Sequence, residues 1–141
     1  MIQPIISAVN DPAPPWSIGF AIIYEDAMYI KITEHYRQLA KREGGGGRLQ
    51  FMSYHYGACG DERDDDGFPY KEDQCALRID IDKRSLRHAH WNGEDHIPEH
   101  RLMGLDFEAI TPSVFIRAVE EHRATGRPLP EILGFEVRAA R

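Results

Sequence analysis

The sequence predicts a small α+β domain, in which an antiparallel sheet of three to five strands packs against an N-terminal and a C-terminal helix. Three observations lead to this prediction. Apolar residues fall at helical spacing between Met28 and Ala40, residues 75–82 alternate between apolar and polar, and Thr111-Pro112 opens a second helical pattern. The 141 residues suit one domain, so we expect a proline-rich extended lead-in over residues 1–16 and a single α+β domain over residues 17–141.

The N-terminal half of the domain is open to two interpretations. The apolar spacing predicts a helix over residues 26–43, with Asp26 as its N-cap and Gly44 in the left-handed position after its end. Residues 18–24 are β-branched and aromatic, so a strand there, or a hairpin through Ile32, is the alternative. The four consecutive glycines at 44–47 predict a flexible joint before a central strand.

The C-terminal half has clearer signals. Thr111 is a capping residue, Pro112 suits the first helical position, and Gly126 suits the position after the last turn. The other expected elements, in order, are a central strand at 49–57, a polar loop at 58–74, a half-buried strand at 75–82, a return strand at 86–91, a turn at Asn92-Gly93, a further strand at 101–107, the helix from 112 and an edge strand at 132–137.

Charge and composition restrict the partners. The net charge of −6 disfavours non-specific binding to nucleic acid, which usually requires a basic face. It suits a protein that docks on a basic partner, and the acidic cluster at Asp64, Asp65 and Asp66 is the expected partner-binding segment. We expect Cys59 and Cys75 to be thiols. No apolar run reaches the ~20 residues that span a bilayer, and the start resembles no secretory leader, so we expect a cytoplasmic protein without membrane contact.

Residues 88–101 hold four of the seven histidines. His88 and His90 lie on the return strand, so their side chains share one face. A two- or four-residue turn before this strand would place both on the apolar face, whereas a three-residue turn would pair Asp80 with His88 and Arg78 with His90. We favour the three-residue turn, although it exposes a leucine, because two neighbouring imidazoles are costly to bury without partners.

In the favoured register the polar face carries the groups of a metal-independent endoribonuclease. One imidazole can take the proton from a ribose 2′-hydroxyl while the other protonates the leaving oxygen. The guanidinium of Arg78 can stabilise charge on the phosphate, and Asp80 can orient an imidazole. The expected catalytic residues are therefore His88, His90, Arg78 and Asp80. Nearby side chains that could bind substrate are Arg87, Trp91 and Arg101.

A metal site is the alternative use of the same segment. Two imidazoles separated by one residue on a strand point the same way, so His88 and His90 together with His96 or His100 could bind a divalent metal and leave one coordination position open. The endoribonuclease would need no cofactor.

Short motifs resemble the TumE-like toxin family. They are Leu77-Arg78-Ile79-Asp80, then His88-Ala89-His90, then the helix from Thr111 to His122, and they fall within residues 49–122. Such toxins are similar to the BrnT and RelE class of ribonucleases, and Ile79 stands here where they carry a tyrosine. The resemblance implies RNA cleavage that an antitoxin restrains. The competing hypotheses are a non-enzymatic acidic interaction protein, such as a phage-type inhibitor of a nucleic-acid-binding complex, and a histidine-based metal protein.

Overall fold

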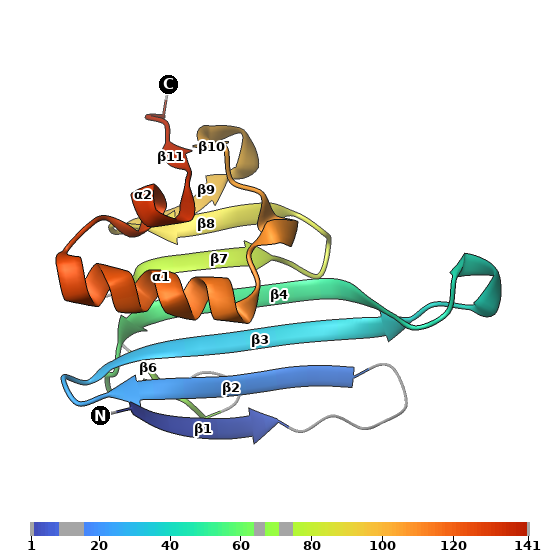
Figure 1. Cartoon of the computed structure of the whole chain (residues 1–141), viewed down its shortest axis with the longest axis horizontal. Coiled ribbons are helices and arrows are strands. Elements are labelled where there is room, and N and C mark those ends of the chain that lie inside the picture. Colours follow the sequence, from blue (N-terminus) through green and yellow to red (C-terminus); the bar gives the residue numbers. More distant parts are fainter. Residues whose placement is uncertain (1, 9–15, 64–66, 71–74, 141) are drawn as a thin grey trace.

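The computed structural model describes residues 2–8, 16–63, 67–70 and 75–140. Its main element is a seven-stranded antiparallel sheet with the order β1-β2-β3-β4-β7-β8-β9 (Figure 1). The strands are β1 (Ile2–Ala8), β2 (Trp16–Tyr24), β3 (Met28–Gln38), β4 (Gly47–Ala58), β7 (Cys75–Ile81), β8 (Arg87–Trp91) and β9 (Glu94–Pro98). The α+β class is confirmed, and the sheet is larger than the three to five strands predicted.

The predicted N-terminal helix is wrong, and the alternative strands are present. β2 and β3 form a hairpin whose turn includes Ala27 in the left-handed region at φ 63°. Met28, Ile32 and Tyr36 are four residues apart, a spacing that fits a helix but also one face of a strand. Ile30, between the first two, is fully buried with Ile32, which is the alternation of a strand.

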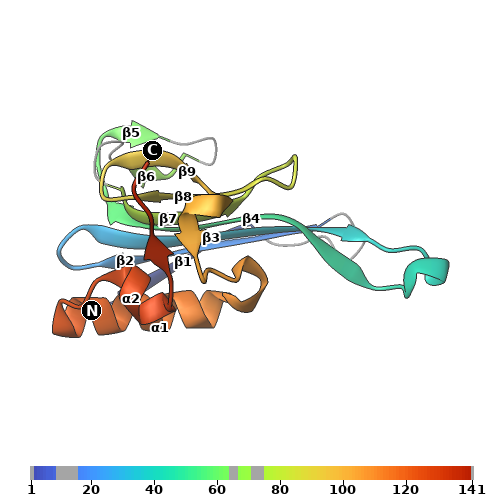
Figure 2. The same cartoon turned by 90° about the horizontal axis from the view of Figure 1, so that it is seen from above.

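Two segments of the N-terminal part differ from a simple linker. Ile2–Ala8 lie within the expected lead-in, and they pair with β2 as an edge strand, a position in which Pro4 can be accommodated. The glycines at 44–47 do not join a helix to a strand. They follow the short 3-10 helix η1 (Lys41–Glu43) at the far end of the β3–β4 hairpin, which projects beyond the rest of the sheet (Figures 1 and 2).

The predicted C-terminal helix is confirmed as α1 (Pro112–Thr125). The Thr111 hydroxyl accepts a hydrogen bond from the Val114 amide at 3.3 Å, and Gly126 ends the helix at φ 76°. The other elements of this part are the 3-10 helices η3 (Glu99–Arg101) and η4 (Phe107–Ala109), the helix α2 (Leu129–Leu133), and the short strands β10 (Leu102–Met103) and β11 (Glu136–Val137). The strands expected at 101–107 and 132–137 are thus reduced to this two-residue pair, because helical turns, tight turns and irregular backbone occupy the remaining residues.

The helices cover one face of the sheet (Figure 2). Between them lies the main core, in which Tyr54 packs edge-on against Phe115 at 5.7 Å between ring centroids. The opposite face carries the short hairpin of β5 (Glu62–Arg63) and β6 (Pro69–Tyr70), with Phe68 packed on Tyr29 and Ala21. None of the helices in the described ranges is long and apolar enough to cross a membrane. Residues 64–66, the expected partner-binding segment, lie outside the described residues.

Candidate functional site on the sheet face opposite the helices

The register between β7 and β8 is the one that the sequence analysis favoured. Asp80 pairs with His88 and Arg78 pairs with His90, while Ile79 and Ala89 pair on the core side. The side chain of Asp82 accepts hydrogen bonds from the amides of Arg84 and Leu86, and this fixes the turn. Leu86 is 54% exposed, as this register requires. We call the sheet surface opposite the helices the histidine face.

Asp80 is the centre of the cluster on the histidine face. Its carboxylate is 6% exposed and lies 2.7 Å from Arg78 Nε, 3.0 Å from His88 Nε2 and 3.4 Å from His90 Nε2. Burial by itself would raise the pKa of Asp80. The contacts with His88, His90, Arg78 and the Ser53 side chain outweigh burial and hold this pKa far below its usual range. Asp80 is therefore ionised near neutral pH.

The two buried imidazoles retain unused hydrogen-bonding capacity. Their distances to Asp80 are short, but the directions are poor, so Asp80 Oδ1 and both Nε2 atoms lack a well-formed hydrogen bond within the described residues. His90 is also 3.1 Å from Asp95 through Nδ1. Buried polar atoms without good partners are costly in a purely structural site. This arrangement therefore favours a ligand, a metal or a reacting group at the cluster.

His96 joins this cluster through a β-bulge. Ala89 pairs with Ile97 and Trp91 pairs with Glu94, so two residues of β9, Asp95 and His96, stand opposite the single residue His90. His96 has a φ of 49°, which is unfavourable for a residue with a side chain. Its ring lies 5.0 Å from His88 and 4.8 Å from His90 between centroids. The bulge thus brings the side chains of Asp95 and His96 to His90. Strained backbone of this kind is often found at functional sites.

One nitrogen from each of His88, His90 and His96 lies within 4.8 Å of the other two, so these three residues could hold a metal ion. His100, the other ligand considered from the sequence, is exposed on η3 and is not in this group. Asp80 contacts Nε2 of both His88 and His90, and Asp95 contacts Nδ1 of His90, so both ring nitrogens of His90 face a carboxylate and a metal ion would have to displace one of them.

The structure does not bring the three expected substrate-binding residues to the histidine face. Trp91 packs against the main core, because it pairs with Leu77 on the helix side. Arg101 is tied to Glu94 and to the carbonyl of Arg138, which is a structural role. Arg87 forms ion pairs with Glu99 and Glu108 at the end of the sheet.

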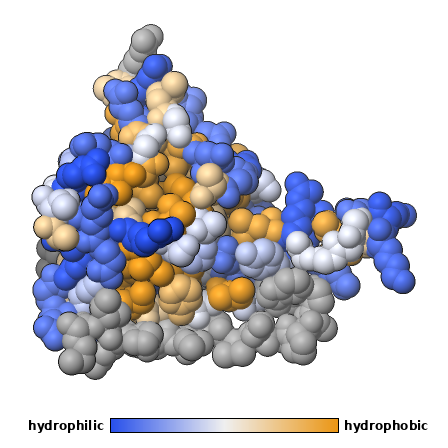
Figure 3. Space-filling model, in the orientation of Figure 1, coloured by the Kyte–Doolittle hydropathy of each residue, from blue (hydrophilic) through white to orange (hydrophobic). Residues whose placement is uncertain are grey.

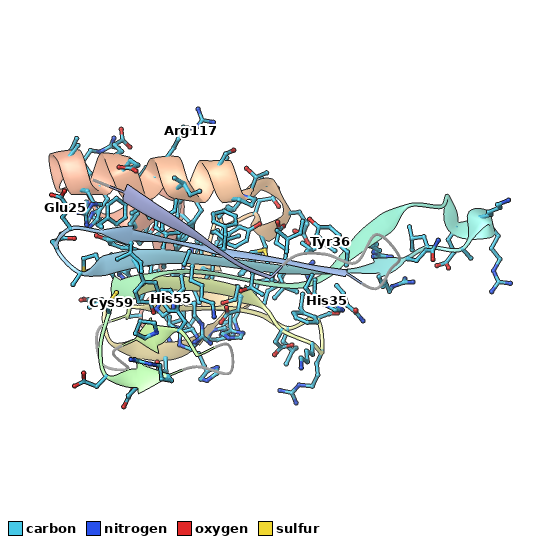
Figure 4. All side chains as sticks on the ribbon, turned by 90° about the horizontal axis from the view of Figure 1, so that it is seen from below. Glu25, His35, Tyr36, His55, Cys59 and Arg117 are labelled. Atoms are coloured by element: carbon cyan, nitrogen blue, oxygen red, sulfur yellow. The ribbon has the colours of Figure 1, made fainter. Side chains whose placement is uncertain are left out.

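Residues of β4 also contribute to the site, and no pattern in the sequence links them to it. Ser53 pairs with Asp80 and His55 pairs with Arg78. Nδ1 of His55 and the Tyr29 hydroxyl share a hydrogen bond of 3.0 Å. Figure 4 shows His55 on the same side of the sheet as Cys59. Burial, together with the positive charge of Arg78, lowers the pKa of His55 to about 3. His55 is therefore a neutral imidazole, and cross-strand neighbours of this kind cannot be found without the strand order.

Scans of this chain against protein-family models, curated proteins and solved structures found no match. The function is therefore argued from the geometry of the histidine face.

Proposed function

We propose that the histidine face cleaves RNA phosphodiester bonds by metal-independent acid–base catalysis. One observation carries this proposal: a buried carboxylate, Asp80, contacts Arg78, His88 and His90 on one surface. Cleavage of RNA needs a proton acceptor, a proton donor and a cation for the phosphate, and two imidazoles with a guanidinium supply all three. The resemblance to TumE-like toxins points to the same reaction.

The contacts suggest a role for each residue. His88 contacts one carboxylate, so it is placed to act as the base that takes the proton from the 2′-hydroxyl. His90 contacts Asp80 and Asp95, and we assign it the role of the general acid. The 2′-oxygen then bonds to phosphorus, the bond from phosphorus to the 5′-oxygen breaks, and that oxygen receives the proton of His90. The products are a 2′,3′-cyclic phosphate and a free 5′-hydroxyl.

Arg78 is the cation available to the phosphate. Its Nε atom contacts Asp80, and its side chain is 37% exposed. The carboxylate fixes the plane of the guanidinium, so the remaining N–H groups can donate to phosphate oxygens. Asp80 is a positioning residue, because it would hold Arg78 and both imidazoles without touching the substrate.

The test is cleavage of a single-stranded RNA by the purified protein in the presence of a chelator. We expect cleavage that yields cyclic phosphate ends, and a loss of roughly 10²- to 10⁴-fold in rate for His88→Ala or His90→Ala. Arg117→Gln is the matched control, because Arg117 points away from the sheet on α1 (Figure 4). Cleavage that survives in the His88→Ala/His90→Ala double variant would refute the proposal.

A divalent metal centre is the second candidate, and the position of His96 favours it. Acid–base cleavage by His88 and His90 does not require His96, whereas a three-histidine site does. Imidazole ligands suit zinc, copper or nickel. In this case the protein purified without a histidine tag would contain about one equivalent of metal, His96→Ala would lose it, and a chelator would abolish any activity. Absence of bound metal would exclude this candidate.

The proposal includes control by a protein partner because of the resemblance to TumE-like toxins. The acidic character of the chain suits docking on a basic partner.

A further inference from the structure

The far end of the β3–β4 hairpin differs in charge from the rest of the molecule. Residues 37–48, which we call the arm, contain Arg37, Lys41, Arg42 and Arg48 but only one acidic residue, Glu43. The arm thus has a net charge of +3 in a chain of net charge −6. Figures 2 and 3 show it extending away from the sheet, with hydrophilic residues at its end.

An open groove lies where the arm leaves the sheet. Its volume is about 570 Å³, and its charged side chains are Arg37, Arg48, Lys83, Arg87 and Glu108. Glu108 is paired with Arg87, so the other three cations give the groove its positive charge. The groove therefore attracts anions, although the protein as a whole repels them.

Two features of the groove lower the stability of the folded protein when no ligand is bound. Arg37 and Arg48 are directly paired across β3 and β4, and like charges in this position repel each other. Glu43 lies 3.8 Å from Arg37, but within the described residues no carboxylate pairs with Arg48. A phosphate bound between these two guanidiniums would relieve the repulsion and accept hydrogen bonds from both.

The groove opens at the end of the sheet on the helix side, where Ile81, Arg87 and Glu108 line it, and Lys83 extends from it to the edge of the histidine face. Lys83, which lines it, also lies over the ring of Phe51 at 5.7 Å. Phe51 stacks on His35 at 4.5 Å between centroids, and Ser53, two residues further along β4, pairs with Asp80. A strand bound in the groove would therefore pass round the end of the sheet, by way of Lys83 and Phe51, to reach the proposed catalytic cluster.

We infer that this groove binds the phosphate backbone of a single RNA strand and directs it to the histidine face. The inference rests on the proposed function and adds the path of the substrate. A volume of about 570 Å³ lies within the roughly 300–1,000 Å³ typical of small-ligand pockets, so it accommodates a short single-stranded segment and not a duplex.

The test measures binding without cleavage. A fluorescent 2′-O-methyl oligonucleotide lacks the 2′-hydroxyl nucleophile, and its anisotropy reports binding to the full chain at about 50 to about 200 mM salt. With about four phosphates bound, the logarithm of the association constant should fall with a slope of about −2.8 against the logarithm of salt concentration. The double variant Arg37→Gln/Arg48→Gln should bind roughly tenfold more weakly, and its slope should shrink by about 1.4.

The matched control is Arg117→Gln/Arg138→Gln, which removes the same charge from exposed positions away from the groove. Equal loss in the two double variants would show a general charge effect and overturn the inference, as would the absence of binding by the wild type at low salt. Inorganic triphosphate could also displace the oligonucleotide completely when both are present at the same concentration of phosphate groups. This result would indicate a site for small anions and would also overturn the inference. If the groove binds the strand but natural RNA is never cleaved, the proposed function is refuted while the inference about the groove stands.

Discussion

Asp80→Asn is the substitution that tests the charge cluster most directly. It keeps the shape of the side chain but removes the charge that contacts Arg78, His88 and His90. The new amide group also places donors against side chains that are themselves donors. We therefore expect a clear loss of stability together with a loss of any cleavage activity.

The magnitude follows from the burial of each partner. Arg78 is 37% exposed, so water screens its contact, and this contact adds at most about 1 kcal/mol. His88 and His90 are only 12% and 8% exposed, so water screens their contacts with Asp80 less. Because these contacts are poorly directed, each contributes about 1 kcal/mol, less than a well-formed hydrogen bond to a charged group. The total is about 3 kcal/mol, which agrees with the cost of breaking a buried ion pair.

The pH dependence gives a second criterion. The pKa of Asp80 is lower in the folded protein than in the unfolded chain, where it is about 3.9. Its stabilising contribution is therefore complete above that value and is lost as the pH falls toward the folded pKa. The difference between wild type and variant should shrink by up to about 1.4 kcal/mol per pH unit below about pH 4.

Urea denaturation, followed by circular dichroism, measures both quantities. Asp61→Asn is the control, because Asp61 is exposed and should change the free energy of unfolding by less than about 0.5 kcal/mol. The reasoning would be refuted if Asp80→Asn were as stable as the control. It would also be refuted if the difference did not shrink in acid.

Three further predictions concern the histidine face, the register and the acidic cluster. His55 has a folded pKa of about 3, below its unfolded value, so the free energy of unfolding should fall by up to about 1.4 kcal/mol per pH unit as the pH falls from 6.5. In urea titrations between pH 7 and pH 5, His55→Phe should show a smaller change of this free energy with pH. An unchanged pH dependence would contradict this prediction. Leu86→Ser should lower the free energy of unfolding by less than about 0.5 kcal/mol, because Leu86 is exposed, and Leu77→Ser should lower it by more than about 2 kcal/mol, because Leu77 is buried. Similar losses in the two variants would contradict the β7–β8 register. Replacing Asp64, Asp65 and Asp66 with Asn should weaken binding to a basic partner in calorimetry, most strongly at low salt, and equal affinities would remove this segment from the interface.

Local signals in the sequence predicted the structure best. The caps of α1 come from Thr111 and Gly126, and both are single residues with defined backbone requirements. The alternation along β7 gave the two faces of that strand, and the turn chemistry reduced the β7–β8 pairing to two registers. The polar register could then be favoured because burying His88 and His90 without partners is costly.

The sequence analysis failed where one pattern fits two structures. Met28, Ile32 and Tyr36 satisfy a helical repeat and also lie on alternate positions of a strand, so spacing cannot separate the two. Long-range pairing decides in favour of the strand, because β4 pairs along the whole of β3 and β2 pairs with residues 29–36, which satisfies most of its backbone groups.

The sequence by itself therefore determined the strand that carries Arg78 and Asp80, the strand that carries His88 and His90, and the helix that covers the opposite face. Only the tertiary structure decided that His96 and Asp95 join this cluster while His100 does not, because a single extra residue in β9 turns both side chains toward His90. Only the strand order placed Ser53 and His55 beside it. Local propensities act over a few residues, whereas the partners of a strand are fixed by pairing between segments that are distant in the chain.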